Sequence, residues 1–247
     1  MISFPTAAPV VGASFIASTV EIVEAFTIVL AVSVVRGLRP AILGTAAALA
    51  VLALAVAIFG PLLASVPIHG LQLVVGILLL IFGLGWLRKA VLRAGGALAL
   101  HDETAEFAKE TALLRRQSAD EKAADWLAGT AAFKAVLLEG TEVVFIVLAV
   151  GAKPGLLLPS AIGAAAACVL VLIAGVMAHA PLSKVPENTL KFIVGGLLTG
   201  FGVFWVCEGL GVPWQGGDWA IPGLVAFYLA AGALLSVMVR GRRAKAT

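Results

Sequence analysis

Four glutamates inside apolar stretches are the residues of this sequence best placed to do chemistry. They form two pairs of the pattern Glu-x-x-Glu, namely Glu21 with Glu24 and Glu139 with Glu142. Residues three positions apart on a helix lie on the same face. An ionised side chain at the centre of a bilayer costs about 2.5–3.5 kcal/mol on insertion scales, so such groups usually face a cavity or the interior of a helix bundle. The two pairs therefore predict a polar site within apolar surroundings.

Cation binding is the chemistry that four converging carboxylates favour. They repel one another unless a cation or protons neutralise them, and oxygen ligands suit hard divalent cations. Nearby hydroxyls could add ligands, although each could instead hydrogen-bond to its own helix; they belong to Ser18, Thr27 and Thr141. We expect a divalent metal ion as the transported substrate, no permanently bound cofactor, and protons as a candidate coupling ion.

Weaker candidates lie near the ends of apolar runs. Met177 and His179 lie on the predicted cytoplasmic side, where they could pass on a soft or borderline metal ion. Glu208 and Asp218 lie at the predicted outer ends of two runs, where they could gather cations at a mouth. A structural role at the membrane interface is the alternative for each of them.

The composition places these residues in a membrane protein. Of the 247 residues, 61% are hydrophobic and 13% are charged, and the mean hydropathy is +1.08. A soluble domain is about 45–50% apolar and about 25% charged. We therefore expect an all-α integral membrane protein with the lipid bilayer as its partner. The distribution of basic residues favours membrane orientation over nucleic-acid binding, and the sequence holds no Walker loop, Gly-x-Ser-x-Gly or His-Glu-x-x-His motif of an enzyme.

Seven apolar runs are long enough to cross a bilayer, for which about 20 residues are needed. Lys and Arg are concentrated in alternate connecting segments, with Lys153 alone in the others. This asymmetry predicts that the N-terminus is outside and the C-terminus inside, in the inner membrane of a bacterium. The predicted spans are 11–35, 40–63, 71–87, 129–150, 157–178, 190–207 and 220–239.

The two halves of the chain repeat. An offset of 118 residues places Glu21 on Glu139 and Glu24 on Glu142, and an offset of 119 places Gly44 on Gly163. Because each repeat holds three spans, the second copy must enter the membrane inverted, as in many secondary transporters. The predicted organisation is a first three-helix repeat (1–87), a cytoplasmic linker with an amphipathic helix (88–127), a second, inverted three-helix repeat (128–210), and a seventh helix with a basic tail (211–247).

Paired glutamates in the first and fourth of seven spans resemble the high-affinity iron permeases of the oxidase-dependent iron transporter family. The signature of that family is Arg-Glu-Gly-Leu-Glu in both spans; residues 139–142 match its Glu-Gly-x-Glu, and residues 21–24 match its Glu-x-x-Glu. Val20 and Leu138 stand where the signature has arginine. The resemblance implies iron translocation through the four glutamates. The calcium/manganese–proton exchangers, which carry one acidic motif in each of two inverted three-helix repeats, are similar in plan.

A transporter for a divalent metal, with iron or manganese favoured, is the leading prediction. One alternative keeps the fold and moves a small organic cation, such as a basic amino acid. Another is a membrane subunit or sensor that does not transport and docks a partner through residues 88–127. The metal, the direction of transport, the coupling ion, and the presence of a homo-oligomer or accessory subunit stay open.

Overall fold

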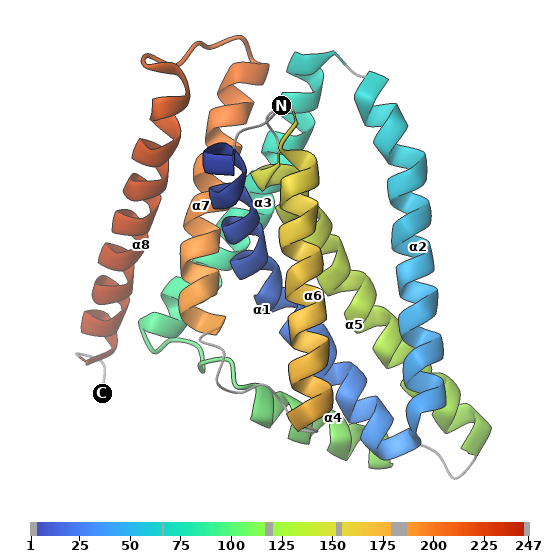
Figure 1. The fold of residues 1–247 in the computed structure, drawn as a ribbon. Helices are drawn as coiled ribbons and strands as arrows, with labels where there is room; N and C mark the ends of the chain where they lie inside the picture. The colour runs from blue at the N-terminus through green and yellow to red at the C-terminus, as the bar shows by residue number, and fades with distance from the viewer. Residues whose placement is uncertain (1–3, 66, 117–120, 152–154, 179–186, 245–247) are drawn as a thin grey trace. The chain divides into compact units, whose positions relative to one another are not determined.

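The computed structural model describes residues 4–65, 67–116, 121–151, 155–178 and 187–244 (Figure 1). The regular secondary structure of these residues is helical, and they form no strand. The fold class predicted from composition is thus confirmed as all-α. The elements are α1 (Phe4–Arg36), α2 (Leu38–Ser65), α3 (Ile68–Ala94), α4 (Glu103–Arg116), α5 (Glu121–Val150), α6 (Leu157–Ala178), α7 (Glu187–Gly209), a short 3₁₀-helix (Gly217–Trp219) and α8 (Ala220–Ala244).

Six of the described helices are long and apolar enough to cross a membrane, namely α1, α2, α3, α6, α7 and α8. This supports a multi-pass membrane protein. The seventh predicted span lies within α5, which does not meet the same criterion. Its apolar half carries Lys134, Glu139 and Glu142, so the residues that mark the candidate site also lower the hydropathy of their helix.

Several helices extend beyond the predicted spans. The helix α3 continues to Ala94 through Arg88, Lys89 and Arg93, and α5 begins at Glu121 rather than at residue 129. Backbone hydrogen bonds within a helix are satisfied in water as well as in lipid, so a helix need not end where its apolar run ends. The two ends of the segment predicted as a linker, residues 88–94 and 121–127, therefore belong to the long helices α3 and α5.

The contacts divide the chain into two compact units. The first unit comprises residues 1–60 and 102–185, and the second comprises residues 61–101 and 186–247. These units cut across the three-helix repeats, which are defined by sequence similarity alone. The helices of the proposed site, α1 and α5, both belong to the first unit.

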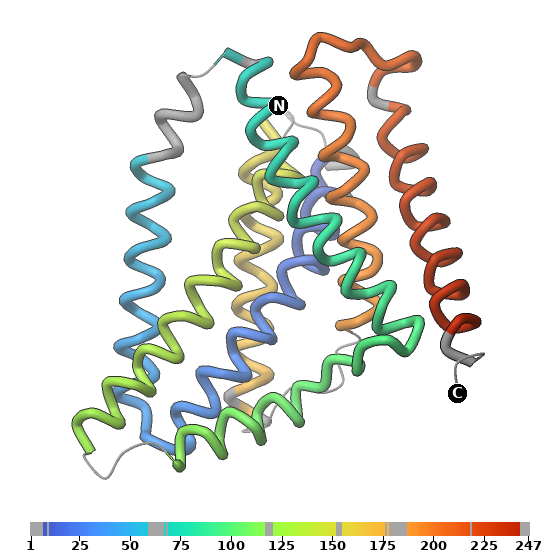
Figure 2. Tube along the Cα trace, turned by 180° about the vertical axis from the view of Figure 1, so that it is seen from behind, coloured from blue at the N-terminus to red at the C-terminus, as the bar shows by residue number. Residues whose placement is uncertain are grey.

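The helix α1 is the centre of the first unit and packs against α4, α5 and α6. Small and β-branched side chains on α1 are almost fully buried, among them Ala17, Val20, Val23, Ala31 and Val32. Side chains of this size let neighbouring backbones approach closely, as is usual in membrane bundles. Figures 1 and 2 show α1 and α5 side by side and antiparallel.

Two glycines mark close helix crossings in the first unit. A Cβ at Gly44 of α2 would overlap the backbone carbonyl oxygen of Gly129 in α5. A Cβ at Gly163 of α6 would overlap the carbonyl oxygen of Val11 in α1. Beyond its crossing, α2 diverges from α5 in both views (Figures 1 and 2) and is not packed along it.

In the second unit, α3 packs against α7, and α8 packs against both. The α3–α7 contact is again made through glycines. A Cβ at Gly76 would lie 3.1 Å from the carbonyl oxygen of Gly202, and a Cβ at Gly195 would lie 3.2 Å from that of Gly83. The 119-residue offset converts the first of these pairs into the second.

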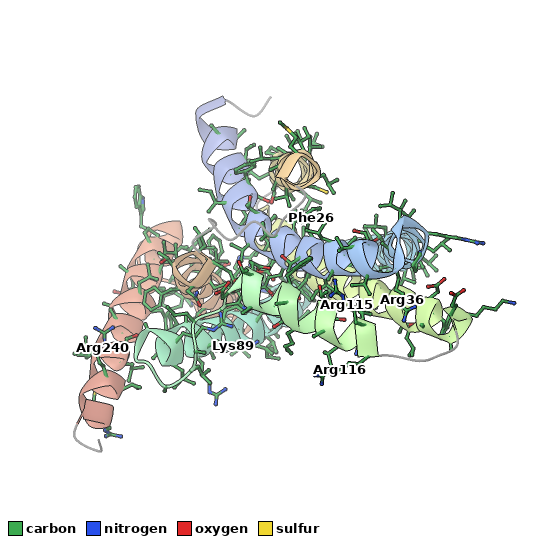
Figure 3. The ribbon with its side chains drawn as sticks, turned by 90° about the horizontal axis from the view of Figure 1, so that it is seen from below. Phe26, Arg36, Lys89, Arg115, Arg116 and Arg240 are labelled. Atoms are coloured by element: carbon green, nitrogen blue, oxygen red, sulfur yellow. The ribbon has the colours of Figure 1, made fainter. Side chains whose placement is uncertain are left out.

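The amphipathic helix α4 is held against the first unit by Leu114. This side chain is 1% exposed and lies in a cluster with Ala31, Val32, Ala41, Ala128 and Ala132. Arg36, at the end of α1, also donates a hydrogen bond of 3.5 Å to the carbonyl oxygen of Leu114. Figure 3 shows Arg36 beside α4, with Arg115 and Arg116 on that helix.

We expect Leu114→Ala to lower the free energy of unfolding by about 2 kcal/mol, because it removes buried methyl groups and leaves a cavity. Leu113→Ala is the matched control, because Leu113 is 46% exposed. Denaturant titration of both purified variants measures the difference. Equal stability of the two variants would show that α4 is not anchored through Leu114.

Candidate cation site

Three of the four predicted glutamates meet inside the first unit. Glu21, Glu24 and Glu139 each offer a carboxylate oxygen, and these oxygens all lie within 4.8 Å of one another. Glu21 is fully buried, whereas Glu24 and Glu139 are partly buried. The carboxylates therefore converge from two helices, as the paired motifs predict.

The packing of α1 on α5 positions these carboxylates. On α1, Glu21 is flanked by Val20 and Val23, which are 0% and 1% exposed and fix that part of the helix in the interior. On α5, Gly140 follows Glu139 and lies against the side chain of Leu52 from α2. Because a Cβ at position 140 would overlap Leu52, the glycine lets this side chain reach α5 next to the carboxylate.

Glu142, the fourth predicted ligand, is not part of this group of three. It is partly buried, and its Oε2 atom is buried without a hydrogen-bond partner among the described residues. The sequence repeat predicts four equivalent carboxylates, but only three of them are brought together in this conformation. The role of Glu142 as a fourth ligand stays a prediction.

The hydroxyl groups near the site fall into two kinds. Thr27 donates to the carbonyl oxygen of Val23 at 3.0 Å, and Thr141 donates to that of Leu137 at 2.6 Å, so both bond to their own helix. Ser18 is fully buried, and its Oγ atom has no hydrogen-bond partner among the described residues. A buried hydroxyl without a partner costs about 1–3 kcal/mol. Of the three predicted auxiliary residues, Ser18 is therefore the one whose oxygen is available to a cation.

A cavity of about 700 Å³ adjoins the carboxylates between α1, α2, α5 and α6. Glu21 and Glu139 are its charged lining residues, and most other lining side chains are apolar. Thr45 and Cys168 also reach it. The volume exceeds what a bare ion needs, so the space can hold water, a hydrated ion or a small organic cation.

The weaker candidates lie away from this group. Met177 is 78% exposed near the end of α6, and His179 lies outside the described residues. In the second unit, the Nε2 atom of Gln72 donates to Glu208 Oε2 at 2.8 Å. The side chain of Asp218 is not among those described, so its proposed role at a mouth stays a prediction.

Several buried polar residues were not singled out by the sequence pattern, among them Ser14, Ser160 and Glu187. Ser14 donates to the carbonyl oxygen of Ser160 at 2.7 Å, and both side chains are fully buried between α1 and α6. Ser14 lies four and seven residues before Ser18 and Glu21, a spacing that places all three on one face of α1 and could have revealed it. In the second unit, buried Glu187 lies 3.3 Å from Arg93 and 3.9 Å from Lys191. These two cations explain its burial as an ion-pair network.

No known protein family, curated protein or solved structure matches this chain. The six long apolar helices of the described residues indicate a multi-pass, all-helical membrane protein.

Proposed function

We propose that this protein is a transporter for a divalent metal cation, with iron or manganese favoured, and not an enzyme. The observation that carries the proposal is the group of Glu21, Glu24 and Glu139, whose oxygens lie within 4.8 Å of one another in an apolar unit. Two oxygens on opposite sides of a divalent ion are separated by about 4 to 5 Å, given ordinary metal–oxygen distances. The group can thus close around one ion with small side-chain movements.

Charge balance supports a cation as the substrate. Three carboxylates in a low-dielectric interior repel one another strongly, and a divalent ion or protons would offset most of that charge. The same groups can bind either protons or the metal, so exchange of one for the other provides coupling. The metal is the transported substrate in this proposal.

The proposed architecture has seven spans, with α5 as the fourth, and two inverted repeats of three helices each. The glycine contacts support it, because the repeat offsets convert the pair Val11–Gly163 into Gly129–Gly44. They also convert Gly76–Gly202 into Gly195–Gly83. The positive charge on alternate connections supports an N-terminus outside and a C-terminus inside, and we propose a bacterial inner membrane as the location.

We further propose a relationship to the iron permeases, based on their paired Glu-x-x-Glu motifs. Val20 and Leu138 replace the arginines of that signature, and the side chain of Val20 is fully buried. An apolar residue there removes a positive charge that would repel the metal. The site should therefore carry more net negative charge than a site that includes the two arginines of the signature. This greater negative charge favours binding of a divalent cation over a monovalent one.

A small organic cation is the second candidate substrate, and the cavity is the observation that favours it. Its volume of about 700 Å³ falls within the range of about 300–1,000 Å³ typical of small-molecule sites. Aliphatic walls with two carboxylates suit an amine that carries an apolar chain. The metal proposal stays first because three carboxylates exceed what one ammonium group requires.

Binding measurements on the purified protein in nanodiscs separate the two substrates. We expect saturable binding of Mn²⁺ or Fe²⁺ by calorimetry, unchanged by a large excess of arginine or another organic amine. Uptake into proteoliposomes should then follow the metal gradient. Displacement of the metal by the amine, or amine uptake without metal uptake, would replace the first candidate with the second.

We expect Ser18→Ala to weaken metal binding about fivefold, because it removes a neutral oxygen ligand worth about 1 kcal/mol. The metal-free variant should be at least as stable as the parent, because a buried hydroxyl without a partner is removed. Thr19→Ala is the matched control, because Thr19 donates to the carbonyl oxygen of Phe15 at 2.7 Å. Unchanged metal affinity in Ser18→Ala would remove this residue from the site.

A further inference from the structure

The line of contact between α1 and α6, which we call the α1–α6 seam, closes one side of the cation site. The side chain of Phe26 fills this seam. A Cβ at Gly175 of α6 would overlap the ring of Phe26, and Figure 3 shows Phe26 beside α6. Phe26 comes two residues after Glu24 and lines the cavity together with Glu21 and Glu139. Along α1, the ring lies between the carboxylates and the end of the helix at Arg36.

The repeat-related seam, between α2 and α5, is open beyond the contact of Leu52 with Gly140. The offset of 118 converts Phe26 into Val144, and the offset of 119 converts Val56 into Gly175. Val56 and Val144 both line the cavity of about 700 Å³, and Val56 is 51% exposed. Figure 2 shows α2 diverging from α5 on this side. Phe26 and Gly175 are therefore in contact between α1 and α6, whereas the equivalent Val144 and Val56 border the cavity between α2 and α5.

The two seams nevertheless cross at equivalent points. The α1–α6 crossing is the contact of Gly163 with Val11, and the α2–α5 crossing is the contact of Gly44 with Gly129. The repeat offsets convert the first contact into the second. The two repeats thus share the same helix crossing but differ in whether the seam beyond it is packed or open. Each repeat can adopt the packing that the other already has, so the two can exchange conformations at little cost.

We propose that Phe26 and Gly175 form a gate of the cation site, and that a second conformation closes Val56 onto Val144 while Phe26 leaves Gly175. The crossings at Gly44 and Gly163 act as fixed pivots. In the predicted orientation, the α2–α5 seam opens the site to the outside and the α1–α6 seam opens it to the cytoplasm. The gate rests on the transport function proposed above, because it gives the same carboxylates access to each side in turn.

The native thiol of Cys168, which lines the cavity, reports access to the site. In a Cys207→Ala background, a membrane-impermeant maleimide should label Cys168 of the parent faster from outside than from the cytoplasmic side. Phe26→Ala should raise labelling from the cytoplasmic side about tenfold or more, because loss of this partly buried ring and its contact with α6 shifts the equilibrium towards the open seam. Gly175→Ala should act in the same direction, since its Cβ displaces the end of a movable side chain.

Phe15→Ala is the matched control, with the same change on the same helix but on the other side of Glu21 in sequence. It should leave labelling from the cytoplasmic side unchanged. The gate is overturned if neither Phe26→Ala nor Gly175→Ala raises that labelling, or if Phe15→Ala raises it equally. The readout needs folded protein in a membrane but no transport.

A cross-link tests the second conformation. The pair Val56→Cys and Val144→Cys, with Cys168→Ala and Cys207→Ala, should form a disulfide when the site alternates, and oxidation should then stop metal uptake reversibly. Failure to cross-link, or full uptake after cross-linking, contradicts the gate. Labelling that responds to Phe26→Ala in a protein that binds no metal would retain the gate and overturn the proposed substrate. Metal binding by a protein whose Cys168 labelling does not respond to Phe26→Ala would support the proposed substrate and overturn the gate.

Discussion

Glu21→Gln should lower the affinity for Mn²⁺ at least about a hundredfold, because a unit charge about 4 Å from another contributes about 4 kcal/mol at an effective dielectric constant of about 20. Glutamine keeps the size of the side chain, and Glu21 is fully buried beside Glu24 and Glu139. The variant should therefore retain its fold. Glu139→Gln should have a comparable effect, because it removes the carboxylate supplied by α5.

A second measurement on the same variant separates a binding site from a structural ion network. Without metal, Glu21→Gln should be at least as stable as the parent, because it relieves repulsion among the carboxylates. Glu121→Gln, an exposed change at the start of α5, should alter neither quantity. Full Mn²⁺ affinity in Glu21→Gln, measured by calorimetry, would contradict the proposed site.

Gly163→Ala should destabilise the protein by about 3 kcal/mol, near the upper end of the usual cost of overpacking. Its Cβ would overlap the carbonyl oxygen of Val11 and lie 3.0 Å from the backbone nitrogen of Phe15. Backbone atoms inside a helix cannot rotate away, so α6 would have to move off α1. Denaturant titration in detergent measures the loss.

Gly12→Ala provides the control for this prediction, because nothing lies within 4 Å of a Cβ at Gly12. Both positions are helical, so the higher helix propensity of alanine contributes about equally to both variants. We expect Gly12→Ala to be neutral or slightly stabilising. If Gly163→Ala were as stable as Gly12→Ala, the crossing would not be a tight contact and could not serve as a pivot.

The sequence was sufficient to predict the helical class and the meeting of α1 and α5. Apolar runs of span length report directly on helices, because backbone groups in lipid must be hydrogen-bonded within the segment. The spacing of Glu21 and Glu24, together with the repeat, predicted carboxylates that converge, and three of the four do. Both inferences depend on local spacing and on a repeat that can be read along the chain.

The asymmetry of the unit could not be predicted from the repeat. Equivalent positions predict equivalent surroundings, yet Glu24 lies within the group and Glu142 lies outside it. The same holds for Phe26, which is packed on α6, and Val144, which lines the cavity. A sequence repeat predicts the same surroundings at equivalent positions of the two halves. This conformation places those positions in different surroundings, which the repeat does not predict.

The packing partner of α4 also depends on tertiary contacts that the sequence does not reveal. Its sequence combines charges with Phe107, Leu113 and Leu114, which indicates an amphipathic helix but not what covers its apolar side. The structure buries Leu114 in the first unit and leaves Leu113 46% exposed. The partner of an amphipathic face depends on distant helices, so periodicity alone does not identify it.

Anomalous diffraction from crystals grown with Mn²⁺ would locate the bound ion. We expect one strong anomalous peak within metal–ligand distance, about 2.0–2.6 Å, of carboxylate oxygens from Glu21, Glu24 and Glu139. The peak should be absent in Glu21→Gln crystals grown under the same conditions. Strong Mn²⁺ peaks elsewhere in the protein, with none between these three carboxylates, would contradict the proposed site.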